Sequence, residues 1–380
     1  MNITTDSLQD LWHKLDDPGS YEWWYFDAED EAQGISIVIV WFFGFAFSPY
    51  YISHYEEWKS AVRSDPPHPG NHAGFSFQLY ENGRETVNFI KEGQGGLFDS
   101  VLPEIGARFE GSSFFCDRLQ QQYNLTVDFE FPARRKRVQG TFSFRPRYRF
   151  DYSRDSDGFT SNSGSSLQWI LSVPKAEVEG EIILNGYRSA DRRELRFRGS
   201  GYHDHNLGTA PMYESIDRWY WGRAFSGRYD LIYYVIFLRG SNTVPVAVMM
   251  LNDNETGLQS VMDDVIIAED NFRRGLFAPT HGKTLRLRNG SVSVEVRHQE
   301  VLDAGPFYLR YGSRLSMDID GCRQDEVRGI SEFLNPISLR SRIMRFFTSS
   351  RVLRDGKPST MYIGYNFFKH QIDWLNRKIF

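Results

Sequence analysis

Four consecutive side chains that donate, accept or exchange protons are the most chemically informative feature of this sequence. They are His203, Asp204, His205 and Asn206, within the glycine-flanked stretch GSGYHDHNLG at residues 199–208. A carboxylate beside an imidazole is a pairing that enzymes use for acid–base catalysis, because each group shifts the pKa of the other. The residue types and their spacing therefore predict a proton-handling site.

Two other interpretations of this stretch remain open. A metal site would need a third ligand, for which His72 or Glu22 could serve, although no spacing fixes either one. The third interpretation is a structural polar turn. In a strand, His203 and His205 share one face and Asp204 lies on the other, whereas a turn would let these side chains converge.

A second cluster is the aromatic and acidic segment YEWWYFDA at residues 21–28. Alternate residues of a strand share a face. One face then carries Glu22, Trp24 and Phe26. The other face carries Trp23, Tyr25 and Asp27. The segment is either a strand that fills a barrel with aromatic rings, or an aromatic wall beside an acidic group in a binding site.

A third cluster, DRWYWGRAFS at residues 217–226, repeats the aromatic alternation. Trp219, Trp221 and Arg223 share a face if this segment is a strand. Indole rings beside a guanidinium suit a planar, electron-rich ligand, and their π faces also stabilise a cationic carbon. Plain barrel packing gives the same alternation, so both interpretations stay open.

Composition excludes several classes of partner and cofactor. The net charge is only −5, and the longest basic run is Arg134–Arg137, so nucleic acid is not an expected partner. The sequence has no glycine-rich phosphate loop, no G-x-S-x-G elbow and no H-E-x-x-H pair. We therefore expect chemistry without a nucleotide, a metal or any other cofactor.

The location of the protein is predicted from its cysteines and from its N-terminus. Cys116 and Cys322 are far apart and have no redox or zinc spacing, so unpaired thiols in a reducing compartment are expected. The polar N-terminus lacks the apolar core of a signal peptide, which favours the cytoplasm. The longest apolar run, Ile37–Ile52, is shorter than the roughly 20 residues that a membrane span needs. We expect a buried strand there, and leave open a peripheral membrane contact at Pro49–Ile52.

The elements that position these clusters are predicted to be mainly strands. Most segments are short, rich in β-branched and aromatic residues, and separated by Gly, Asn, Asp or Pro. Asn289-Gly290 predicts a tight hairpin turn between two alternating segments. Helices are expected only over residues 5–15, 54–62 and 337–347, and loops over residues 64–72 and 147–166.

Many short strands with few helices predict an all-β protein with antiparallel sheets closed or stacked into barrels or sandwiches. The aromatic content of 16% agrees with this class, since bulky rings favour strands. We expect two β-domains, residues 1–205 and 206–380. The oligomeric state is not predicted.

Four motifs in this order resemble the carotenoid hydratase family, also called hydroxyneurosporene synthase. They are YEWWYFDA, FSPYY at residues 47–51, GYHDHNLG and WYWGRA. The same segments are similar to AttH-like proteins and to the fungal lipocalin-like Diels–Alderases. The resemblance covers residue 18 to the end of the chain. It implies two calycin- or lipocalin-like β-domains and cofactor-free chemistry on an apolar polyene or isoprenoid substrate.

Carried over residue by residue, the resemblance makes Asp204 the acidic centre, with His203, His205 and Asn206 as its neighbours. The aromatic residues it implies are Trp23, Trp24, Tyr25, Trp219 and Trp221. We add Glu22, Tyr202 and Arg223 as residues that would contact the substrate.

The mechanism we expect is hydration of a terminal double bond. Asp204 would protonate the alkene, and the tertiary cation would lie against Trp219, Trp221 or Trp24. Water held by His203, His205 or Asn206 would then add, with a histidine accepting the surplus proton.

Two alternatives remain open. A pericyclase would only hold the polyene in a ring-forming pose and polarise a carbonyl through Tyr202, Asn206 or Arg223. A non-catalytic protein would bind apolar pigments in the same cavity.

Overall fold

The computed structural model describes most of the chain. It covers residues 1–94, 96–100, 103–132, 136–154, 166–186, 192–240, 245–274, 279–357 and 360–365. Parts of two predicted features lie outside the described residues, namely Arg134 and Arg135 of the basic run and residues 155–165 of the polar loop.

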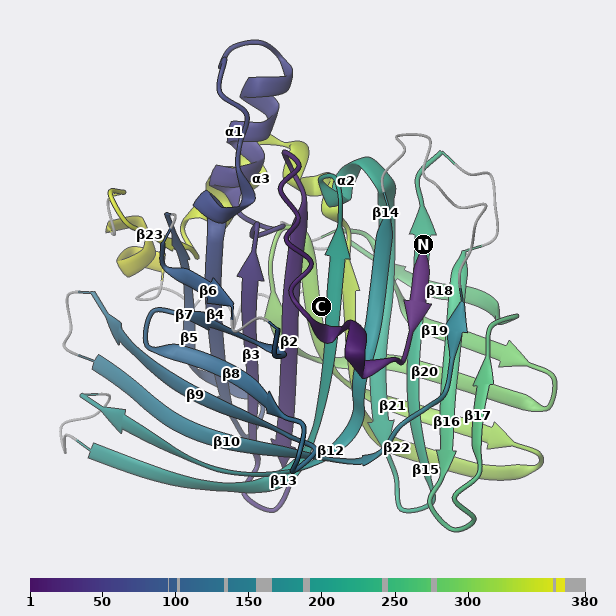
Figure 1. The fold of residues 1–380 in the computed structure, drawn as a ribbon. Coiled ribbons are helices and arrows are strands. Elements are labelled where there is room, and N and C mark those ends of the chain that lie inside the picture. The colour runs from purple at the N-terminus through teal and green to yellow at the C-terminus, as the bar shows by residue number, and fades with distance from the viewer. Residues whose placement is uncertain are drawn as a thin grey trace. The chain divides into compact units, whose positions relative to one another are not determined.

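The chain divides into two compact units. Unit 1 begins at Met1, extends to Pro211 and includes the later segment Ser349–Ile363, and unit 2 contains Met212–Thr348. Both units are built almost entirely from antiparallel strands, with a few short helices (Figure 1). The predicted all-β class is confirmed.

Among its described residues, unit 1 contains one sheet of 14 strands. The strands are β1 (Asn2–Thr4), β2 (Tyr21–Asp30), β3 (Ile35–Phe43), β4 (Ala73–Glu81), β5 (Arg84–Gly93), β6 (Phe98–Ser100), β7 (Gly106–Phe109), β8 (Ser112–Asp117), β9 (Gln122–Phe131), β10 (Lys136–Tyr148), β11 (Ser153–Arg154), β12 (Leu167–Asn185), β13 (Arg192–Gly208) and β23 (Leu353–Arg354). Their main order in the sheet is β23-β5-β4-β3-β2-β13-β12-β10-β9-β8-β7-β6. Among the described residues, all pairings in this sheet are antiparallel except β1 with β12 and β23 with β5.

The core of unit 1 follows from the alternation of apolar and polar residues. In β9, Tyr123, Leu125, Val127 and Phe129 are buried, while the residues between them are more exposed. The Phe129 ring stacks on Phe89 with centroids 4.1 Å apart. Full burial of one such side chain contributes about 1.5–3 kcal/mol. The sheet therefore curls around an aromatic interior, along which the long strands β12 and β13 run side by side (Figure 1).

Unit 2 contains a sheet of nine strands with its own core. The strands are β14 (Ile216–Phe225), β15 (Tyr229–Leu238), β16 (Val246–Asp253), β17 (Gln259–Met262), β18 (Ile266–Arg273), β19 (His281–Asn289), β20 (Val292–Ala304), β21 (Tyr308–Ile319) and β22 (Cys322–Leu334). The predicted hairpin is confirmed, because Asn289 of β19 pairs with Val292 of β20 and Gly290 turns at a φ of +54°.

The helices are short. Among the described residues they include the 3-10 turns η1 (Ser7–Asp10), η2 (Pro69–His72) and η3 (Pro336–Arg340), and the α-helices α1 (Pro49–Lys59), α2 (Met212–Ser215) and α3 (Arg342–Ser349). No helix among the described residues is long and apolar enough to cross a bilayer.

The helix predicted over residues 5–15 is wrong, because this segment forms only the turn η1 and is extended at Leu11. Trp24 Nε1 donates to the Asp10 carbonyl oxygen at 3.1 Å, and the Asp10 side chain is buried. Tertiary contacts thus use the groups that a continued helix would need, and they override the local helical pattern.

The helix predicted over residues 54–62 lies largely within α1, which begins earlier than expected. Ser48 caps it, since its hydroxyl oxygen accepts hydrogen bonds from the N–H groups of Tyr50 and Tyr51. Pro49, Tyr51 and Ile52 are buried. These three side chains therefore do not form an exposed apolar edge.

Candidate active site

The HDHN segment forms the last part of β13, not a turn. Tyr202, Asp204 and Asn206 point to one face of the sheet, while His203 and His205 point to the opposite face. All five side chains are buried. Convergence of the two histidines with Asp204 is therefore contradicted, because the strand pleat separates them.

Asp204 is held by three hydrogen-bond donors. Trp169 Nε1 and the Tyr202 hydroxyl both donate to Oδ2 at 2.8 Å, and Asn206 Nδ2 donates to Oδ1 at 3.1 Å. Trp169 comes from the neighbouring strand β12, where it pairs directly with Asn206. Because an indole N–H can only donate, Oδ2 must act as an acceptor.

The face around Asp204 is lined by further aromatic rings from β2. Tyr25 pairs with Asp204, and Trp23 pairs with Asn206. The Tyr25 hydroxyl donates to Oδ2 of the buried Asp27 at 2.9 Å. Trp23 and Tyr25 are thus placed beside the acidic group, as their alternation predicted, whereas Trp24 faces the core of unit 1.

The opposite face carries a buried ionic network. His203 Nε2 and the Tyr123 hydroxyl lie 2.8 and 2.7 Å from Asp10 Oδ2. His205 lies between two carboxylates, with Nδ1 3.2 Å from Asp10 Oδ1 and Nε2 2.9 Å from Glu22 Oε1. The Trp24 ring stacks on His205 with centroids 4.5 Å apart.

In this network the carboxylates favour the protonated histidine, and the histidines favour the ionised carboxylates. Burial alone would lower the pKa of His205, but Asp10 and Glu22 outweigh it and raise this pKa to about 9. Burial would raise the pKa of Asp10 and of Glu22, yet the neighbouring histidines hold both pKa values below their usual range. Glu22 and the two histidines therefore stabilise the interior of unit 1 and do not line the Asp204 face.

One group of metal-ligating residue types occurs among the described residues, at His13, Glu22 and His205. Zinc takes such ligands. Glu22 Oε1 lies 2.8 Å from His13 Nδ1 and 2.9 Å from His205 Nε2, which are ion-pair separations. His72, the other suggested ligand, instead pairs with Glu92 at 2.5 Å.

Unit 2 places the third sequence cluster on β14. Trp219, Trp221 and Arg223 share one face and are buried, while Tyr220 and Ala224 on the other face belong to the core of unit 2. The Arg223 guanidinium lies over the Phe225 ring, 4.7 Å from its centroid. These three side chains are thus buried on the face of β14 opposite to Tyr220 and Ala224.

Comparison with known proteins identifies the family. Residues 39–360 match the sequence model described as carotenoid hydratase CrtC. The chain belongs to the carotenoid hydratase CrtC family. The matched range includes Trp169, all of β13 and all of β14, and therefore Asp204 and its three hydrogen-bond donors, but not Trp23 and Tyr25 of β2. The family resemblance predicted from the four motifs is confirmed.

Two relatives illustrate the range of this CrtC family. The hydroxyneurosporene dehydrogenase of Chlorobaculum tepidum is 63% identical over 377 residues, which span 99% of this chain and 98% of that protein. The acyclic carotenoid 1,2-hydratase of Rubrivivax gelatinosus is 27% identical over 216 residues, covering 54% of this chain and 45% of that protein.

Two solved structures share the fold of this CrtC-family protein. The crystal structure of CghA aligns with a TM-score of 0.57 at 12% identity, over 88% of this chain and 97% of that one. A putative AttH from Nitrosomonas europaea aligns with a TM-score of 0.53 at 15% identity, over 83% and 92%. They support the lipocalin-like assignment of the fold.

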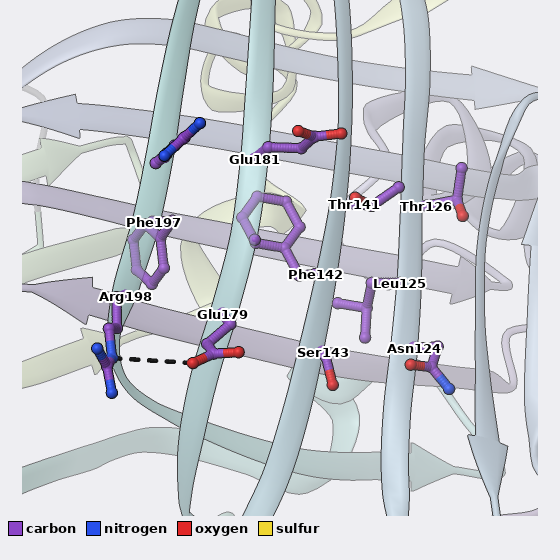
Figure 2. A pocket seen from close by; sticks show the side chains of 12 residues that line it. Asn124, Leu125, Thr126, Thr141, Phe142, Ser143, Glu179, Glu181, Phe197 and Arg198 are labelled. Carbon is purple, nitrogen blue, oxygen red and sulfur yellow. Dashed lines mark ion pairs between the residues drawn. The ribbon is translucent and has the colours of Figure 1, made fainter.

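A groove of about 700 Å³ lies elsewhere on unit 1 of this CrtC-family protein, across β9, β10, β12 and β13 (Figure 2). Its lining includes the exposed side chains of Glu179, Glu181 and Arg198, and Arg198 Nε lies 3.8 Å from Glu179 Oε1. None of the sequence-predicted site residues lines it. Charged walls do not suit an apolar ligand, so we do not assign the substrate to this groove.

Sequence reasoning missed Trp169, which supplies a direct hydrogen bond to Asp204 in this CrtC-family site. Its segment, LQWILSV, predicts a buried strand, but only the register of β12 against β13 shows that the indole reaches Asp204. Asp10 and His13 were missed as well, because they fall in the segment that was predicted to be a helix.

Proposed function

We propose that this protein hydrates a terminal C=C bond of an acyclic carotenoid, with Asp204 as the proton donor. The family match and the names of its relatives support a carotenoid substrate. The observation that carries the proposal is the pair of donors, Trp169 and Tyr202, on a single oxygen of a buried carboxyl group.

This geometry suits a carboxylic acid that must protonate carbon. Since Oδ2 accepts two hydrogen bonds, the proton to be transferred sits on Oδ1. Once the proton leaves, Trp169 and Tyr202 stabilise the carboxylate that remains, which lowers the barrier.

The reaction balances without another reagent. The π electrons of the terminal alkene form a C–H bond with the Asp204 proton and leave a tertiary cation. Water, oriented by Asn206, adds to this cation and returns its extra proton to the Asp204 carboxylate, so the net change is addition of one water.

The aromatic residues would hold the polyene and its cation. Trp23 and Tyr25 are on the Asp204 face, and their π faces can stabilise positive charge on carbon. We also assign Trp219, Trp221 and Arg223 to substrate binding. That assignment is supported by the shared face of two indole rings and a guanidinium on β14.

The decisive experiment compares Asp204→Asn with Asp27→Asn in deuterated solvent. Asp27→Asn is the matched control, because it removes another buried carboxyl from the same face. We expect Asp204→Asn to lose more than about tenfold in turnover, and wild-type product to carry a solvent deuteron on carbon. Turnover retained in Asp204→Asn, or lost only in Asp27→Asn, would remove Asp204 from this role.

The product mass separates hydration from its rivals. Hydration adds the mass of one water, whereas a dehydrogenation, the activity in the name of the Chlorobaculum tepidum relative, removes two hydrogens. A pericyclic ring closure leaves the mass unchanged and puts no deuterium on carbon. A pigment-binding protein gives no product at all.

For the cellular location, we propose the cytoplasm with reversible contact to a membrane. Cys116 and Cys322 are free thiols, which supports a reducing compartment.

A further inference from the structure

The helix α3 in unit 2 turns its apolar side chains toward solvent. Ile343, Phe346 and Phe347 are 65%, 58% and 38% exposed. Their i, i+3 and i+4 spacing places them on one helical face. A helix on a globular protein usually packs such a face against the core, so the amphipathicity of α3 is reversed.

The inward face of α3 is polar, and its side chains form hydrogen bonds. Arg345 is buried, and its Nη1 donates to the carbonyl oxygens of Leu339 at 2.9 Å and Arg340 at 2.8 Å. Thr348 is buried as well and donates to the Met344 carbonyl oxygen. These hydrogen bonds fix the rotation of α3 about its axis. The exposure of its apolar face is therefore set by the folded structure.

The sequence from residue 333 to residue 354 carries only positive charges, although the whole chain has a net charge of −5. Between Glu332 and Asp355 the sequence contains five arginines and no acidic residue. Arg340 and Arg342 are exposed beside the apolar face. This combination is complementary to an apolar layer beneath negatively charged groups.

We propose that α3 docks the protein on an anionic phospholipid surface. Ile343 and Phe346 would enter the boundary of the acyl chains, and Arg340 and Arg342 would meet the phosphates. Apolar residues combined with arginines are the composition of interfacial helices. The benefit of docking rests on the proposed function, because an apolar acyclic carotenoid would partition from water into the bilayer.

Vesicle cosedimentation of the full chain tests this surface. The probe is a phosphatidylcholine vesicle with or without phosphatidylglycerol. We expect wild type to bind the anionic vesicles and to be released by salt, and the double variant Ile343→Ser/Phe346→Ser to bind at least fivefold less. The matched control is Phe272→Ser on β18, since Phe272 is 59% exposed and Phe346 is 58% exposed. It should bind like wild type.

Three outcomes would overturn the proposal. They are no binding of wild type to anionic vesicles, equal losses in the double variant and in Phe272→Ser, and equal binding to neutral and anionic vesicles. A concentration-dependent dimer that the double variant abolishes, without vesicle binding by wild type, would assign the face to a second copy of the chain.

A separate assay keeps this proposal distinct from the proposed function. With carotenoid dispersed in detergent, the double variant should turn over like wild type, whereas with carotenoid in anionic vesicles it should be slower by the factor lost in binding. If wild type gives no hydrated product in either medium but binds vesicles through α3, the docking surface stands and the proposed function fails.

Discussion

At the scale of single residues, the two oxygens of Asp204 are not equivalent. Trp169 and Tyr202 both donate to Oδ2, whereas the Asn206 amide donates to Oδ1. Such donors stabilise a carboxylate more than a carboxylic acid. Their contribution to the proposed reaction is therefore larger in the transition state than in the ground state.

Trp169→Phe tests this argument, because it keeps an aromatic ring and removes the N–H donor. We predict a fall in kcat of roughly 10²-fold, the effect of losing one donor to a developing anion, with little change in KM. Steady-state hydration kinetics measure both parameters. Tyr25→Phe is the control, because its hydroxyl donates to Asp27, and a comparable fall in that variant would contradict the assignment.

At the scale of elements, the pairing of β2 with β13 sets both polar networks. Phe26 pairs with His203 and stacks on it, while Tyr25 pairs with Asp204 on the other face. The glycines before the HDHN segment permit this close pairing. A Cβ added at Gly199 would lie 2.0 Å from the Glu29 carbonyl oxygen, and one at Gly201 would lie 2.6 Å from the Phe144 ring.

Gly199→Ala should therefore separate β2 from β13. We predict a loss of about 3 kcal/mol in the free energy of unfolding, because the backbone oxygen of Glu29 cannot move without breaking the strand pairing. Urea unfolding followed by tryptophan fluorescence measures it. Gly227→Ala should cost less than about 1 kcal/mol, since nothing lies within 4 Å of its added Cβ. Equal losses in the two variants would show that the close contact of Gly199 with Glu29 does not determine the free energy of unfolding.

At the scale of the whole molecule, each unit buries a histidine with an opposite preference for its proton. In unit 1, Asp10 and Glu22 raise the pKa of His205 to about 9. In unit 2, His298 is packed against Tyr311 and hydrogen-bonded to Ser331, and burial lowers its pKa to about 3. His205 is thus a buried imidazolium, whereas His298 is a buried neutral imidazole.

Stability should accordingly peak near pH 6.5, the ordinary pKa of histidine. The stabilisation from His205 is complete below that pH and is lost as the pH rises through about 9. His298 has the opposite effect. Between pH 6.5 and about 3 its imidazole is protonated in the unfolded chain but neutral in the folded chain, so stability falls as the pH falls through this range. Each slope should approach about 1.4 kcal/mol per pH unit.

Chemical unfolding between pH 4 and 9, roughly the span of the two titrations, measures these slopes. His205→Gln should remove the alkaline slope and, by leaving two carboxylates unpaired, lower stability by about 3–5 kcal/mol. His298→Gln should reduce only the acid slope. An unchanged alkaline slope in His205→Gln would contradict the raised pKa.

The sequence alone determined the all-β class, the hairpin at Asn289-Gly290 and the family, because strand alternation, turn chemistry and ordered motifs are local properties. It also placed Trp23 and Tyr25 on the face of β2 opposite Glu22 and Trp24. Its prediction of a helix over residues 5–15 failed, because that local pattern does not reveal that the barrel interior binds Asp10.

Only the tertiary structure decided which polar groups meet. Trp169 reaches Asp204 through the register of two long strands, and the pleat of β13 assigns His205 to Asp10 and Glu22 on the opposite face. Register and pleat bring together residues as far apart in the sequence as Asp10 and His205, which are separated by 195 positions. Such contacts depend on how all the intervening strands pair, which is why no short stretch of the sequence encodes them.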